Sequence, residues 1–186
     1  MFWEIRVVTD MMRDVITPKK LPKYITKEEI IKVLSTAKND SYRNYIMLLT
    51  MWRTGIRRSE VINIQKRDII DGMLEVRDGK GHKDRVIPLE KELENLLGLY
   101  SDRMNSTDIL FNMSNRNVNY IIEKYRHRSD ISAHTFRHSF AVYCLKNGMN
   151  LRTLQKILGH SCLTTTQVYL DIAGTDIKDD FGKVEW

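Results

Sequence analysis

Residues 73–89 read MLEVRDGKGHKDRVIPL. Apolar and polar side chains alternate over Met73–Arg77 and again over Arg85–Leu89, which is typical of half-buried strands. The Asp78–Gly81 segment between them contains two glycines and is a strong turn signal. The stretch therefore predicts an antiparallel β-hairpin, and the short apolar run Ile109–Phe111 is a candidate third strand.

Helical signals surround this hairpin on both sides. Thr26 and Glu29 form a capping-box pattern that predicts the start of a helix. Helix ends are predicted near three glycines, because glycine readily adopts the left-handed conformation of a C-cap; these are Gly55, Gly148 and Gly159. Further helices are predicted after the Asn39-Asp40-Ser41 cap candidates, from about Glu90, over Val118–Tyr125 and around His134–Lys146. The predicted fold class is mainly α with a small antiparallel β-sheet (α+β).

Length, composition and charge set the broad class of the protein. The chain has 186 residues, 42% of them hydrophobic, which is enough for one domain with a sizeable core. No apolar run approaches the roughly 20 residues that span a bilayer, and the N-terminus does not resemble a signal peptide. Because its two cysteines lie in apolar contexts, we expect a cytoplasmic protein without a disulfide framework.

The distribution of charge favours an acidic partner. The net charge is +6, and no acidic residue occurs between Ile131 and Leu170. Such a positive stretch attracts phosphates and releases counterions when it binds DNA. A solvated basic surface would look the same, so charge alone does not identify the partner.

Six residues that could carry chemistry are dispersed along the chain. In the predicted helix around His134–Lys146, Phe136 and Phe140 fall on one side and His134 and Arg137 on roughly the opposite side. We expect the aromatic side, with Tyr143, to face the core and the side with His138 to face outward. The six candidates are Arg57, Lys80, His134, Arg137, His160 and Tyr169.

The order of these residues resembles the tyrosine recombinase (phage integrase) family, which includes Xer-type and archaeal viral integrases. Thr54–Glu60 matches the TGxRxxE segment of that family, and Gly79–Leu89 resembles its hairpin with a catalytic lysine. His134–His138 matches HxxRH, and Leu158–Tyr169 resembles the LGH and nucleophile-bearing segments. The resemblance covers roughly residues 21–173.

The resemblance implies a role for each residue. Tyr169 would be the nucleophile that forms a 3′-phosphotyrosine link with DNA, and His134 its general base. Arg57, Arg137 and His160 would stabilise the phosphate oxygens, since a guanidinium offers a fixed fork of donors. Lys80 would protonate the leaving 5′ oxygen. Glu60 and His138 would support the site.

The resemblance implies no cofactor, ATP or metal. The i, i+4 spacing of His134 and His138 could suggest a zinc pair, but the metalloprotease pattern requires Glu where Thr135 stands. No phosphate-cradling P-loop is present in the sequence.

The resemblance also suggests how the chain is organised. Residues 1–20 are interpreted as an N-terminal extension or linker, 21–173 as the catalytic domain, and 174–186 as a tail for possible subunit exchange. Family members usually carry a preceding DNA-binding domain, whereas only about 20 residues precede the catalytic region here. The expected partners are double-stranded DNA and other copies of the chain, which would form a tetramer on DNA and be monomeric when free.

Two other functions stay open from the sequence. A type IB topoisomerase uses similar tyrosine chemistry but relaxes supercoils. A DNA-binding regulator that has lost catalysis would share the fold, although retention of all six candidate residues argues against it.

Overall fold

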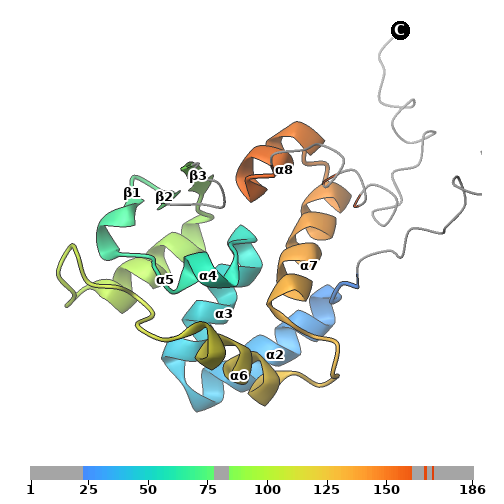
Figure 1. Ribbon diagram of the computed structural model, residues 1–186, viewed down its shortest axis with the longest axis horizontal. Helices are drawn as coiled ribbons and strands as arrows, with labels where there is room; N and C mark the ends of the chain where they lie inside the picture. Colours follow the sequence, from blue (N-terminus) through green and yellow to red (C-terminus); the bar gives the residue numbers. More distant parts are fainter. Residues whose placement is uncertain (1–22, 78–83, 161–165, 167–168, 170–186) are drawn as a thin grey trace, which may run out of the picture.

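The computed structural model describes residues 23–77, 84–160, 166 and 169 (Figure 1). Helices dominate, and one small sheet lies at the side of the bundle. The elements are α2 (Lys27–Asp40), α3 (Tyr42–Thr54), α4 (Arg58–Val61), the 3-10 helix η1 (Lys66–Asp68), β1 (Ile69–Ile70), β2 (Met73–Val76), β3 (Arg85–Pro88), α5 (Lys91–Ser101), α6 (Asn115–Tyr125), α7 (Ala133–Lys146) and α8 (Leu151–Leu158). The predicted α+β class is confirmed.

Local capping fixes the first two helices. Thr26 caps α2, its hydroxyl accepting from the backbone N–H of Glu29 while the Glu29 carboxylate accepts from the N–H of Thr26. The Ser41 hydroxyl caps α3 by accepting from the backbone N–H of Asn44. The predicted starts of both helices are confirmed, because these signals depend only on neighbouring residues.

Helix α3 forms the centre of the core. It packs against α2, α5 and α7, and Ile46, Met47, Leu48 and Met51 are fully buried. A helix that is apolar nearly all round is expected at such a central position. The surrounding helices therefore hold fixed positions relative to the two ends of α3.

The sheet is antiparallel in the order β1-β2-β3. Its register sets Leu74 opposite Ile87 and Val76 opposite Arg85. The predicted pairing of the two hairpin strands is confirmed, although the predicted turn, Asp78–Gly81, lies outside the described residues.

The prediction that Ile109–Phe111 adds the third strand is wrong, because that strand is β1. Ile109 forms only an isolated bridge with Gln65. Leu110 and Phe111 are buried, and the Phe111 ring stacks on Tyr100 with centroids 5.6 Å apart. The apolar run thus fills the core as an irregular segment.

Helix α7 differs from the expected two-faced helix. Phe136 and Phe140 are buried as predicted, but Arg137 is buried as well and Tyr143 is exposed. The cause is that α7 packs against α3, α6 and α8, which cover it on several sides. Its C-cap is Asn147, one residue before the predicted Gly148, whose φ is 82°.

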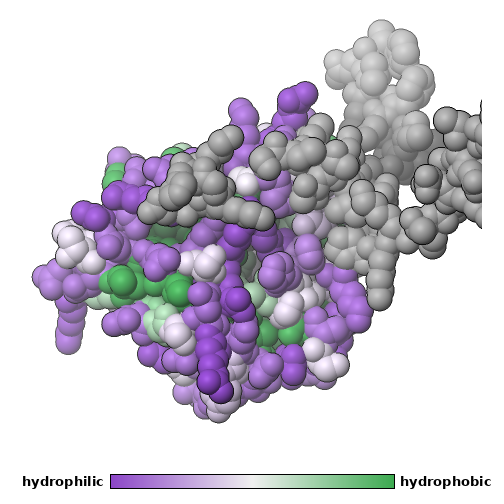
Figure 2. All heavy atoms as spheres, in the orientation of Figure 1, coloured by the Kyte–Doolittle hydropathy of each residue, from purple (hydrophilic) through white to green (hydrophobic). Residues whose placement is uncertain are grey.

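The surface seen in Figure 2 is largely hydrophilic, with small apolar patches separated by polar side chains. None of the helices in the described ranges has the length and apolar character needed to cross a bilayer. Cys144 is a free, buried thiol, and burial raises its pKa to about 12. The predicted extension 1–20 and tail 174–186 lie outside the described residues.

Candidate active site

A left-handed turn at Gly55 brings Arg57 to the site. Gly55 is the C-cap of α3, with φ 62° and ψ 19°, and a Cβ at this position would lie 2.4 Å from Cδ1 of Phe140. Only glycine satisfies both the backbone conformation and this close approach to α7. The chain then turns directly into α4, and Arg57 occupies the N-cap of that helix.

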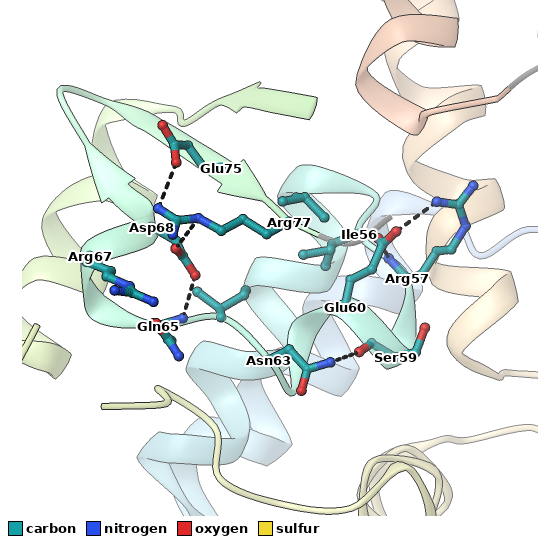
Figure 3. A pocket seen from close by; sticks show the side chains of 12 residues that line it. Ile56, Arg57, Ser59, Glu60, Asn63, Gln65, Arg67, Asp68, Glu75 and Arg77 are labelled. Atoms are coloured by element: carbon teal, nitrogen blue, oxygen red, sulfur yellow. Dashed lines mark hydrogen bonds and ion pairs between the residues drawn. The ribbon is translucent and has the colours of Figure 1, made fainter. Parts of the chain in front are cut away.

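Glu60 holds Arg57 from within α4. Its Oε1 accepts from Nη1 of Arg57 at 2.8 Å, and its Oε2 accepts from the Arg57 backbone N–H at 2.8 Å (Figure 3). Burial favours a higher pKa for Glu60, but hydrogen bonds from Arg85 and Arg57, together with the charge of Arg85, lower it to about 2. Glu60 is therefore ionised at neutral pH, which fits its predicted supporting role.

Arg137 reaches the same region from α7. Its Nη1 donates to the carbonyl of Gly55 at 2.6 Å, and its Nη2 donates to the carbonyl of Leu158. Burial, with the charges of Arg57 and Arg85, lowers its pKa to about 9, so the group stays protonated at neutral pH. Two helix C-terminal ends, those of α3 and α8, thus stabilise one buried guanidinium.

The two candidate arginines converge on the end of α8. Nη2 of Arg57 donates to the Gly159 carbonyl at 3.2 Å, next to the Leu158 carbonyl that Arg137 contacts. The Arg57 side chain is 23% exposed, whereas Arg137 is buried. Two residues 80 positions apart in sequence therefore meet at consecutive carbonyl groups.

His160 follows directly after this turn. Gly159 is the predicted C-cap of α8, with φ 64°, and the His160 carbonyl accepts from Nε2 of Gln155 at 3.1 Å. Its ring Nδ1 lies 3.0 Å from Oγ1 of Thr166. Burial, followed by the charges of Arg137, Arg57 and Arg85, lowers the pKa of His160 to about 4. The ring is accordingly neutral at pH 7.

Tyr169 is buried, with only 2% of its surface exposed, but its hydroxyl has a polar partner. The hydroxyl oxygen lies 2.7 Å from Nδ1 of His138. Burial raises the pKa of Tyr169, and the charge of Arg137 partly offsets that rise. Burial and the charges of His134 and Arg137 lower the pKa of His138. The Tyr169 hydroxyl is therefore paired with His138 and lies close enough to Arg137 to feel its charge.

The histidine at the tyrosine hydroxyl is His138, which the sequence interpretation placed in a supporting role. His134, the predicted base, is exposed, and its ring centroid lies 6.5 Å from that of His138. Lys80, the predicted acid, lies outside the described residues. The structure thus brings together Arg57, Glu60, Arg137, His138, His160 and Tyr169.

Arg85 was missed by the sequence interpretation. Its Nη1 and Nη2 donate to the two carboxylate oxygens of Glu60 at 2.9 and 2.7 Å. A local signal existed, because Arg85 and Ile87 fall on one strand face and Ile87 is buried. An arginine on a buried face requires an acidic partner.

A groove of about 730 Å³ opens beside Arg57, between α4 and β2 (Figure 3). Three arginines and three carboxylates line the groove. Nε of Arg77 forms an ion pair with Asp68 at 3.0 Å. The groove therefore adds no net charge to the site. Among the described residues, no group of three or more His, Cys, Asp or Glu side chains is arranged to hold a metal ion.

Comparison with known proteins places this chain in one family. The profile described as "Phage integrase family" matches residues 23–175. The chain belongs to the phage integrase family.

Individual relatives are similar over most of the chain. The tyrosine recombinase XerA of Thermococcus kodakarensis is 36% identical over 169 residues, covering 83% of this chain and 60% of that protein. The tyrosine recombinase XerD of Staphylococcus haemolyticus is 35% identical over 187 residues, covering 89% and 63%. The chain thus spans about three-fifths of the length of these curated relatives.

Solved structures share the fold. A crystal structure of XerA recombinase superposes with a TM-score of 0.72 at 25% identity, covering 92% of this chain and 67% of that one. The catalytic domain of bacteriophage HP1 integrase gives 0.72 at 21% identity, covering 87% and 94%. The Tn1549 transposon integrase in complex with circular intermediate DNA gives 0.70 at 20% identity, covering 94% and 68%. The predicted recombinase catalytic-domain fold is confirmed.

Proposed function

We propose that this chain is the catalytic domain of a site-specific tyrosine recombinase that cleaves and rejoins DNA through a covalent link to Tyr169. The observation that carries the proposal is the convergence of Arg57 and Arg137 on the consecutive carbonyls of Leu158 and Gly159, beside His160 and Tyr169. The two guanidinium groups repel each other because both are positively charged, and a bound phosphate would reduce that repulsion. The similarity to XerA and to HP1 integrase supports the same reading.

In the proposed cleavage step, the Tyr169 oxygen attacks the scissile phosphorus in line with the 5′ oxygen. A bond forms between the tyrosine oxygen and phosphorus, and the bond between phosphorus and the 5′ oxygen breaks. Arg57 and Arg137 stabilise the charge on the nonbridging oxygens, and neutral His160 contributes a hydrogen bond to them. The resulting 3′-phosphotyrosine conserves the bond energy, so religation consumes no ATP.

Two proton transfers accompany this step. The tyrosine proton leaves to a histidine of α7: the family pattern assigns His134, while His138 is the residue that contacts the hydroxyl in this structure. Lys80 donates a proton to the 5′ oxygen that leaves. Neither transfer requires a metal ion or a cofactor in this scheme.

The proposal extends to how the protein assembles. The substrate is double-stranded DNA, in a reducing cytoplasm, with recombination carried out by a tetramer. Residues 21–173 would form the catalytic domain, 1–20 a linker, and 174–186 a segment that contacts a neighbouring subunit. The tail carries an apolar stripe at Ile177, Phe181 and Val184 on an otherwise acidic segment. Deleting 175–186 should lower the mass of the DNA-bound assembly, and an unchanged assembly would contradict this use of the tail.

A covalent-capture experiment tests the catalytic proposal. The protein is incubated with a pool of nicked duplexes of randomised sequence, and denaturing gels are used to detect a protein–DNA adduct. Peptide mapping should locate the DNA on Tyr169, and Tyr169→Phe should give no adduct. An adduct on another residue, or none with any duplex, would contradict the proposal and favour the regulator.

A second assay separates recombinase from topoisomerase. Supercoiled plasmid without an enriched cleavage sequence is incubated with the protein at low concentration. Relaxation by a monomer without site preference would identify a type IB topoisomerase. Cleavage confined to sequences enriched in the adduct pool supports the recombinase.

A further inference from the structure

Arg85, at the start of β3, is a buried cation outside the set of residues to which the sequence assigned chemistry. Its side chain is 8% exposed, and all three of its guanidinium nitrogens donate hydrogen bonds. Nη1 and Nη2 form a two-point pair with Glu60, and Nε donates to the Ile157 carbonyl at 2.7 Å. Because the side chain is buried and each guanidinium nitrogen already donates to a protein acceptor, Arg85 is built as a fixed connection within the protein.

The connection joins three segments that are distant in sequence. Glu60 lies 25 residues before Arg85, and Ile157 lies 72 residues after it. Glu60 in turn holds both the backbone and the side chain of Arg57. The Arg85 guanidinium therefore connects β3 to α4, which has Arg57 at its N-cap. It also connects β3 to the last turn of α8, at Ile157, three residues before His160.

The stem of Arg85 also lies against the turn at Gly159. A Cβ at Gly159 would be 2.9 Å from Cδ of Arg85 and 3.3 Å from its Nε. The left-handed glycine thus leaves the space that the Arg85 side chain fills. This same turn supplies the Gly159 carbonyl that accepts from Arg57.

Charge balance gives Arg85 a second effect. Glu60 carries one negative charge between two guanidinium groups, so the three groups together carry a net charge of +1. If Arg85 were neutral, Glu60 and Arg57 would form a closed pair with no net charge. Arg57 would then stabilise the charge that develops on the scissile phosphate less strongly, because the carboxylate beside it would compete for the same donors.

We propose that Arg85 is a positioning residue for the cleavage site, which acts through Glu60 on Arg57 and through the end of α8 on His160. The proposal rests on the recombinase function proposed above. It predicts that Arg85 sets the rate of tyrosine attack without touching DNA. A displacement of about 1 Å at a reacting centre lowers a rate by about 100-fold, so the expected effect is large.

Cleavage by single-turnover adduct formation, on the duplex enriched from the pool, tests this role. Arg85→Gln should lower the rate about 10- to 100-fold, with a dissociation constant for the duplex that changes less than about threefold. Arg85→Lys should recover part of the rate, because it keeps the charge but loses the two-point pair. Arg53→Gln, at an exposed arginine paired with Glu90 and Glu92, is the matched control and should cleave as the wild type does.

A double mutant separates positioning from general damage to the fold. If Arg85 acts through Glu60, adding Arg85→Gln to Glu60→Gln should slow cleavage much less than Arg85→Gln slows the wild type. Equal losses in both backgrounds would overturn the proposal. A wild-type rate for Arg85→Gln would overturn it as well.

A measurement on the free protein keeps the test independent of activity. Carboxyl ¹³C shifts of Glu60 should titrate at higher pH in Arg85→Gln than in the wild type, since Arg57 would be its main remaining cation. An unmoved Glu60 titration in a folded Arg85→Gln protein would overturn the proposal. If the wild type forms no adduct on Tyr169, the recombinase function fails, and this titration still decides whether Arg85 controls Glu60.

Discussion

The hydroxyl oxygen of Tyr169 lies 2.7 Å from Nδ1 of His138, four residues after the histidine that the family pattern marks as the base. Their ring centroids are 5.6 Å apart. A buried tyrosine hydroxyl normally has such a partner, because an unpaired polar group in the interior is costly. The contact therefore stabilises Tyr169 in the position described here.

The first prediction concerns this contact. In a double-mutant cycle of His138→Gln and Tyr169→Phe, urea denaturation should give a coupling energy of about 0.5–1.5 kcal/mol, the usual net value of one hydrogen bond. The matched control is His134→Gln, on the same helix but exposed, which should show no coupling with Tyr169→Phe. Additive effects for His138, or equal coupling for both histidines, would contradict the geometry.

The second prediction concerns Arg137. Arg137→Lys keeps a positive charge but cannot contact the carbonyls of Gly55 and Leu158 and a phosphate with a planar fork. We expect adduct formation to fall by about 100-fold or more, as for the loss of a charge-stabilising donor in other enzymes. Single-turnover rates measure this, with Arg53→Lys as the control. A loss below about fivefold would show that charge alone suffices at this position.

The third prediction concerns the turn that delivers Arg57. Gly55→Ala introduces strain at a positive φ and a methyl group 2.4 Å from Phe140, which together should cost about 2–5 kcal/mol of unfolding free energy. Gly148→Ala is the matched control: its φ is 82°, but nothing lies within 4 Å of the added Cβ. It should cost about 1–2 kcal/mol. Equal losses, measured by urea denaturation, would show that the approach to Phe140 is unimportant.

Local signals predicted the helix ends that shape the site. Thr26, Ser41, Gly55 and Gly159 act within their own turn, so the sequence around each contains the whole cause. The choice of Arg57 and Arg137 as candidates followed from the family pattern. The convergence of their side chains did not, because it depends on how α3, α7 and α8 pack together.

Two features depended on contacts that no local pattern contains. The partner of the tyrosine hydroxyl follows from the rotation of α7 within the bundle, and a pattern containing both His134 and His138 leaves that choice open. The role of Arg85 follows from partners 25 and 72 residues away. Strand alternation could have placed Arg85 on the buried face with Ile87, but the sequence does not say which carboxylate meets it there.

The last prediction is a pH dependence of stability set by His160. Its pKa falls from 6.5 in the unfolded chain to about 4 in the folded protein, because of burial and the charges of Arg137, Arg57 and Arg85. Between these values the unfolded chain binds more protons than the folded protein, so acidification favours unfolding. The free energy of unfolding should therefore decrease from pH 6.5 toward pH 4. One proton limits this slope to about 1.4 kcal/mol per pH unit.

The carboxylate of Glu60 contributes little to the change in unfolding free energy over this pH range. Its pKa is about 2 when folded, so the stability it contributes is present above its ordinary value of 4.5 and is lost only as the pH falls through about 2. Urea denaturation between pH 4.5 and 6.5 thus reports mainly on the histidines, and His160→Gln should flatten the slope. Since the pKa of His138 is also lowered by burial, a smaller slope should persist in that variant. An unchanged slope in His160→Gln would mean that the nearby arginines and burial do not keep His160 neutral. The proposed arrangement of Arg57, Arg137 and His160 around the phosphate would then be contradicted.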